Sequence, residues 1–137
     1  MINKSIMVID SNEEFLGFVL DFLINDMDMN EVVWAVSPEE AWDKMKTYKP
    51  GIVILDLGMN KYNGEELSTL INTVHNSPII LMTSFYENDD YINLSKELGA
   101  DGFTLKEHFK TALVELIAYL EHDKETEFFK DKQHLLN

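Results

Sequence analysis

Short apolar runs alternate along the chain with longer segments in which apolar residues recur every three or four positions. The short runs have the length of strands, and they are Ser5–Asp10, Glu31–Ala35, Ile52–Asp56, Ile79–Thr83 and Gly102–Leu105. The segments with helical spacing are Glu13–Asp26, a segment that follows Ser37, Gly64–Val74, Asp89–Leu98 and a last one from Glu107. The pattern therefore predicts strands and helices in strict alternation.

Helix-boundary residues support these assignments. Ser37 can cap the second helix, with Pro38 at its first position and Glu40 as the capping-box partner. Gly99 follows the fourth helix, where a glycine commonly ends a helix. Ser11 and Glu14 have the spacing of a second capping box, at the start of the first helix.

Alternating strands and helices build βαβ units around a parallel sheet. Several of the predicted strands are apolar at successive positions, as expected where helices cover both faces of a sheet. Because the crossover connections are right-handed, adding successive strands on both sides of the first strand places helices on both faces of the sheet. We predict an α/β fold, a doubly wound five-stranded parallel sheet in a three-layer sandwich.

Composition limits the function. The chain has 137 residues, which fits one domain, and it has no cysteine for disulfides or thiolate metal sites. It has no apolar run of membrane-spanning length and no signal-peptide pattern, so a cytoplasmic setting is expected. The net charge is −14 and all basic residues are lysines, which argues against binding to nucleic acid.

Four polar residues stand at or just after the ends of predicted strands: Asp10, Asp56, Thr83 and Lys106. In doubly wound folds ligands bind at this carboxyl edge, so the four side chains can converge. Two adjacent carboxylates repel each other, and a divalent cation between them would relieve that repulsion. Mg²⁺ suits such a site because it binds oxygen ligands and keeps several of its waters. A lysine ammonium and a threonine hydroxyl suit phosphoryl oxygens. Together these groups are typical of phosphoryl transfer to a carboxylate.

The sequence resembles the response-regulator receiver domains, the phosphoacceptors of two-component signalling. The resemblance covers roughly residues 5–121 and rests on four motifs in order, "MVIDSNEEF", "VILDLGMNKYNGEEL", "IILMTS" and "ELGADGFTLKEH". It implies a flavodoxin-like fold with strand order 2-1-3-4-5. It also implies a receiver domain over residues 1–121, with residues 122–137 as a C-terminal helical extension or linker.

The resemblance assigns a role to each site residue. Asp56 would be phosphorylated by a histidine kinase or a phosphotransfer protein. Asp10, Asp56 and the backbone carbonyl of Gly58 would hold Mg²⁺, and Lys106 would contact the phosphoryl group. The resemblance thus implies a phosphoacceptor signalling domain rather than an enzyme. Its own chemistry would be limited to self-phosphorylation and dephosphorylation of Asp56.

The resemblance also implies how a signal would leave the site. Thr83 would move toward the phosphoryl group, and Phe103 would follow as the switch aromatic. The face formed by residues 89–98, 102–105 and 107–121 would change and could form a homodimer. The regulated partner is expected to be a protein, and an output domain could follow in a longer chain.

Three departures from the family pattern bear on this reading. Ser11 stands where receivers carry a second acidic residue, so it could hold the metal only weakly or through water, with Glu13 near enough to help. Asn60 and Glu107 stand where receivers have prolines, which leaves open whether the peptide after Lys106 is cis.

Other readings remain open. Ser11 favours a pseudo-receiver that keeps the fold for protein contacts and binds Mg²⁺ poorly. Asp56 could cap a turn, Lys106 could be solvated and Phe103 could be a core residue. An enzyme of the haloacid dehalogenase type would need an aspartate at Gly58, and a flavodoxin would need a different loop after the first strand.

Overall fold

The computed structural model describes residues 5–59, 78–86 and 89–121 of the chain. Its five-stranded parallel sheet has the order β2-β1-β3-β4-β5, as predicted. The strands are β1 (Ile6–Ile9), β2 (Val32–Ala35), β3 (Ile52–Asp56), β4 (Ile79–Ser84) and β5 (Gly102–Leu105). The predicted helix over residues 64–74 and the predicted extension over residues 122–137 lie outside the described residues.

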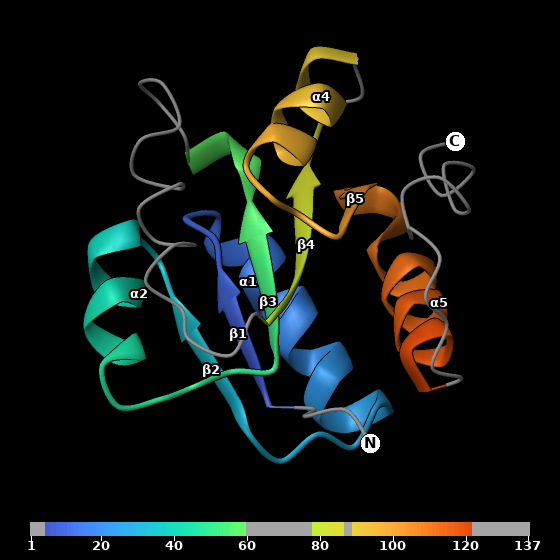
Figure 1. Ribbon diagram of the computed structural model, residues 1–137. Coiled ribbons are helices and arrows are strands. Elements are labelled where there is room, and N and C mark those ends of the chain that lie inside the picture. The colour runs from blue at the N-terminus through green and yellow to red at the C-terminus, as the bar shows by residue number, and fades with distance from the viewer. Residues whose placement is uncertain (1–4, 60–77, 87–88, 122–137) are drawn as a thin grey trace.

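Helices cover both faces of the sheet (Figure 1). They are α1 (Glu13–Asp21), α2 (Pro38–Met45), α4 (Asp89–Glu97) and α5 (Phe109–Glu121). Three short helical turns complete the described chain: the π-helical η1 (Phe22–Asp26) and the 3₁₀ turns η2 (Leu57–Met59) and η3 (Lys106–His108). No helix within the three described ranges is long and apolar enough to cross a membrane.

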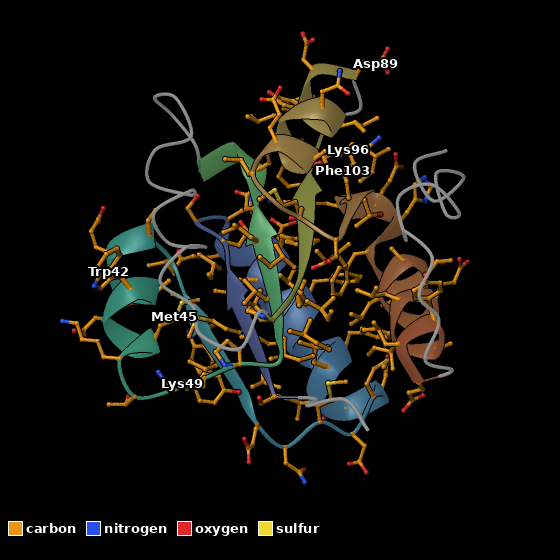
Figure 2. The ribbon with its side chains drawn as sticks, viewed as in Figure 1. Trp42, Met45, Lys49, Asp89, Lys96 and Phe103 are labelled. Atoms are coloured by element: carbon orange, nitrogen blue, oxygen red, sulfur yellow. The ribbon has the colours of Figure 1, made fainter. Side chains whose placement is uncertain are left out.

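The core has two parts because successive strand residues point to opposite faces of the sheet. Ile6 and Val8 of β1 pack in the cluster beneath α1 and α5. Met7 and Ile9 pack in the other cluster, with residues of α2 and α4. Figure 2 shows Met45 on the side of α2 toward the sheet, and Met45 belongs to this second cluster.

The predicted ends of α2 and α4 are confirmed. The Ser37 hydroxyl accepts a hydrogen bond from the Glu40 amide at 3.1 Å, and the Glu40 carboxylate accepts one from the Val36 amide at 2.9 Å. The reciprocal bond of the capping box thus reaches one residue further back than expected. After α4, Gly99 has φ +89°, and its amide donates to the Lys96 carbonyl, which satisfies the helix end.

The predicted capping box at the start of α1 is wrong. Asn12, not Ser11, caps the helix, and its side-chain oxygen accepts from the Phe15 amide at 2.8 Å. The cause is the carboxylate of Asp10, which accepts from the Asn12 amide at 2.8 Å and closes a turn that leaves Ser11 exposed. The helix therefore starts one residue later than the Ser11–Glu14 spacing predicted.

The peptide bond that follows Lys106 is trans, as are the other peptide bonds of the described residues. This answers the question that the absent proline raised. Lys106 begins η3 and is buried, with 4% of its surface exposed. The chain thus turns directly from β5 toward the edge of the sheet where the predicted site lies.

Candidate functional site

Strand alternation brings three of the predicted site residues to one face of the sheet. Asp10, Asp56 and Thr83 each stand two positions after a residue of the core beneath α1 and α5, namely Val8, Ile54 and Leu81. The register of β3 and β4 pairs Asp56 directly with Thr83. The apolar rows of β1, β3 and β4 therefore end in polar groups at the same edge, as the sequence predicted.

Lys106 completes the cluster from η3. Its ammonium Nζ lies 2.9 Å from Asp10 Oδ2 and 3.4 Å from Asp56 Oδ1. All three side chains are almost fully buried. A buried charge is unstable without an opposite charge beside it, so both carboxylates depend on Lys106, while Lys106 keeps a partner if either carboxylate remains.

The cluster holds two carboxylates and one ammonium, and this imbalance acts on Asp56. Burial raises the pKa of the Asp56 carboxyl, and the negative charge of Asp10 raises it further. The positive charge of Lys106 and the hydrogen bond from the Gly58 amide, 3.0 Å from Asp56 Oδ1, act in the opposite direction. The net effect raises the pKa of Asp56, so a further positive charge beside it would favour the ionised carboxylate.

Gly58 keeps the Asp56 carboxylate uncrowded. A Cβ atom at position 58 would lie 3.3 Å from Asp56 Oδ1 and 3.5 Å from Oδ2. These distances are at or below ordinary van der Waals contact, so a side chain at position 58 would press against both carboxylate oxygens of Asp56. The absence of a side chain thus preserves room beside Asp56.

The hydroxyl of Thr83 is buried and has no hydrogen-bond partner among the described residues. Buried hydroxyls in proteins are normally hydrogen-bonded, so an unsatisfied one calls for an explanation. Thr83 neighbours Asp56 in the sheet register. A group added to Asp56 would give this hydroxyl an acceptor.

The donor set fits a divalent cation with oxygen ligands. Asp10 and Asp56 supply two buried carboxylates with an excess of negative charge, and the Gly58 carbonyl follows on the next turn. Mg²⁺ needs only one or two carboxylates because it keeps several waters. Ser11 and Glu13 are exposed, and no cluster of three or more potential acidic, histidine or cysteine ligands occurs in the part of the chain that the structure describes.

Phe103 lies on the other face of the sheet. Its side chain is buried beside α4, in the cluster that contains Met82 (Figure 2). In the register, Phe103 pairs with Met82, whereas Thr83 pairs with Thr104. The structure therefore does not bring Thr83 and Phe103 together as strand partners, and Phe103 already occupies an inward position.

Sequence reasoning missed two aromatic residues at the site. The Lys106 ammonium lies 4.1 Å from the centroid of the Phe85 ring and 4.7 Å from that of the Phe15 ring. The sequence alone predicts a place at the site for neither ring. The available signal was the position of Phe85, two residues after Thr83 at the same edge of the sheet.

Comparisons with known proteins identify the family of the chain. The family model described as "Response regulator receiver domain" matches residues 6–118. The transcriptional regulatory protein DegU of Brevibacillus brevis is 26% identical over 140 aligned positions, which cover 96% of this chain and 59% of DegU. The alkaline phosphatase synthesis transcriptional regulatory protein PhoP of Bacillus subtilis is 32% identical over 105 positions, covering 76% of this chain and 42% of PhoP.

A solved structure shares the fold. It is the complex of the P1 domain of CheA3 with CheY6 from R. sphaeroides, and the matched chain has a TM-score of 0.70 and 21% sequence identity. The match covers 86% of this chain and 99% of that chain. The chain described here thus corresponds to a whole domain of that structure but to only part of DegU and PhoP.

Proposed function

Because the chain belongs to the response regulator receiver domain family, the signalling modules of two-component systems, we propose that it accepts a phosphoryl group on Asp56 from a histidine kinase or a phosphotransfer protein. One observation carries the proposal. Asp56 is buried at the end of β3, paired with the Lys106 ammonium and adjacent in register to the unsatisfied Thr83 hydroxyl. A phosphoryl group on Asp56 would satisfy both neighbours.

The chemistry assigns each side chain a step. An ionised oxygen of Asp56 attacks phosphorus, and the bond from phosphorus to the donor atom breaks as the donor departs with its electron pair. Lys106 holds a positive charge beside the incoming oxygens, and Thr83 donates a hydrogen bond to one of them. Asp56 becomes an acyl phosphate, the signalling state of the module.

Asp10, Asp56 and the Gly58 carbonyl would hold Mg²⁺ beside this carboxylate, with Ser11 contributing at most through a water. The ion would supply neutralisation of phosphoryl charge that Lys106 alone leaves incomplete. Asp10 has a second task, because its other oxygen holds the Asn12 amide and so fixes the loop before α1. The metal site and the start of α1 therefore share one side chain.

The second candidate function is that of a pseudo-receiver, a phosphorylation-independent interaction module. Two observations favour it. Ser11 is exposed and is not an acid, and Lys106 already pairs with Asp10 at 2.9 Å. If this ion pair competes successfully with the cation, the site stays closed to Mg²⁺.

Phosphorylation by a small donor separates the two candidates. We expect acetyl phosphate with saturating Mg²⁺ to add one phosphoryl mass to the protein, and Asp56→Asn to abolish the addition. Asp43→Asn is the matched control, because Asp43 is an exposed carboxylate on α2. Labelling of the Asp56→Asn protein at the wild-type level would refute the phosphosite, and no labelling of wild-type protein would favour the pseudo-receiver.

The proposal extends to the setting of the domain. The partner that delivers the phosphoryl group is a protein, and so is the partner that reads it, because the net charge of −14 opposes contact with nucleic acid by this domain. The face of α4, β5 and α5 is the proposed regulated surface and dimer contact. A cytoplasmic location and an output domain in the full-length protein complete the proposal.

A further inference from the structure

Two aromatic rings lie against the Lys106 ammonium in addition to its two carboxylate partners. The centroids of Phe15 and Phe85 lie 4.7 and 4.1 Å from its ammonium, and the two rings are 6.3 Å apart at an interplanar angle of 69°. An ammonium within about 6 Å of a ring centroid is attracted by the negative face of the ring. Lys106 therefore has two acidic neighbours and two aromatic ones.

The two rings are held differently. Phe15 is 8% exposed and packs edge-to-face on Phe109 of α5, with centroids 5.8 Å apart. Phe85 is 57% exposed and follows the last residue of β4. Phe15 is thus a buried core residue, whereas Phe85 is a surface residue whose ring nevertheless lies against the buried Lys106 ammonium.

This placement affects the strength of the Lys106 charge. A charge acts more strongly on its neighbours when water is kept away from it, and preorganised charges contribute most to transition states. The carboxylates of Asp10 and Asp56 attract the ammonium toward the site, while the two rings occupy space that water would otherwise take. Removing the exposed ring would let water reach the ammonium and weaken its effect at Asp56.

We propose that Phe85 is a positioning residue for Lys106: together with Phe15, its ring covers the ammonium and holds it dehydrated beside Asp10 and Asp56. The effect on phosphoryl transfer rests on the proposed function, whereas the cover itself does not. Phe85 would act through Lys106 and would not touch the phosphoryl group.

The cover is tested by acylation of lysines with an N-hydroxysuccinimide ester, followed by peptide mass spectrometry. The rate at Lys106 is compared with that at Lys46, whose side chain is exposed. We expect Phe85→Ala to raise the relative rate at Lys106 by about two- to thirtyfold, the range that ordinary cation–π strengths imply. Tyr86→Ala is the matched control, because Tyr86 is the adjacent residue and is 68% exposed. An unchanged Lys106 rate in Phe85→Ala, or an equal rise in Tyr86→Ala, would overturn the proposal.

The role in positioning is tested by the rate of phosphorylation with acetyl phosphate at saturating Mg²⁺. Phe85→Ala and Phe85→Leu should both slow the reaction by about two- to thirtyfold, and Phe85→Tyr should restore it, because only tyrosine keeps an aromatic face. A leucine variant as fast as wild type would show that bulk suffices and would overturn the role of the ring. If wild-type protein is not phosphorylated at all, the proposed function fails, and the acylation rates still decide whether Phe85 covers Lys106.

Discussion

Asp10 and Asp56 share the ammonium of Lys106, so the cluster carries more negative than positive charge in a buried place. Burial and Asp10 raise the pKa of Asp56, which means that the fold disfavours the ionised carboxylate. The site therefore reduces the stability of the domain at neutral pH. This cost is the expected counterpart of a reactive carboxylate, because function commonly opposes stability at such sites.

Replacing Asp56 should stabilise the protein. The pKa of Asp56 is raised above its ordinary value of 3.8, so its stabilising contribution is present in acid and is lost as the pH rises through the raised pKa. We expect Asp56→Asn to increase the free energy of unfolding at pH 7 by about 0.5–2 kcal/mol. The gain should shrink as the pH falls toward 3.8. Urea denaturation in EDTA across this range measures it, with Asp43→Asn as the control, and a loss of stability at pH 7 would contradict the argument.

Ser11 controls the affinity for Mg²⁺ if the cation binds between Asp10 and Asp56. A carboxylate about 4 Å from the ion contributes roughly 4 kcal/mol at an effective dielectric constant of about 20, and a third of that is about tenfold in affinity. We therefore expect Ser11→Asp to tighten Mg²⁺ binding by roughly tenfold or more in calorimetric titration. Because Ser11 is exposed and does not cap α1, stability should change by less than about 0.5 kcal/mol. Unchanged affinity would mean that position 11 does not face the metal.

At the scale of elements, the start of α1 links secondary structure to the site. The Asp10 carboxylate accepts a hydrogen bond from the Asn12 amide, and the Asn12 side chain accepts one from the Phe15 amide. These two hydrogen bonds fix the loop after β1. The Phe15 ring also lies against the Lys106 ammonium. The Asn12 cap thus positions a residue of the site as well as starting α1.

Loss of this cap should cost stability, and the cost should fall on residue 12 rather than on residue 11. We expect Asn12→Ala to lower the free energy of unfolding by about 1 kcal/mol, since it removes the acceptor of the Phe15 amide. Ser11→Ala should change it by less than about 0.5 kcal/mol. Thermal or urea unfolding compares the two variants, and the reverse order would restore the capping box of Ser11 and Glu14.

The strands could be predicted because each is a short apolar run, separated from the next run by a segment with helical spacing. The positions of Asp10, Asp56 and Thr83 could be predicted from the strand ends. Side chains alternate between the two faces of the sheet, so the row of core residues on one face continues into these polar residues at the carboxyl edge. The start of α1 was misplaced because a contact from Asp10 competes with local capping signals. The π-helical turn at residues 22–26 was also missed, since helical spacing does not reveal one wider turn.

The Lys106 environment shows the other limit of sequence reasoning. The four polar groups were found because the topology alone brings strand ends together. The rings of Phe15 and Phe85 approach Lys106 from α1 and from the loop after β4, and no periodic pattern connects these three positions. Such contacts depend on side-chain directions in three dimensions, so they require the structure.

At the scale of the whole molecule, the paired strands β4 and β5 connect the site to the proposed output surface. Thr83 ends the row that faces Asp56, while the adjacent Met82 packs with Phe103 in the cluster that includes residues of α4. A shift of the end of β4 toward the phosphoryl group would therefore disturb contacts on the opposite face of the sheet. Because Phe103 is already buried, we expect repacking beneath α4 rather than a simple inward rotation.

Amide hydrogen exchange with and without beryllofluoride and Mg²⁺ tests this coupling. A phosphoryl group adds about 1.5 to 2 negative charges, which would attract the Lys106 ammonium and the Thr83 hydroxyl, and the mimic supplies the same acceptors. We expect exchange to change across residues 89–121, which contain α4, β5 and α5, as well as around Asp10 and Asp56. Thr83→Ala is the decisive variant: it should still bind the mimic through Lys106 but lose most of the change in α4. If wild-type protein binds the mimic and exchange changes only around Asp10 and Asp56, the signal does not pass through β4 and β5, whatever the chemistry at Asp56.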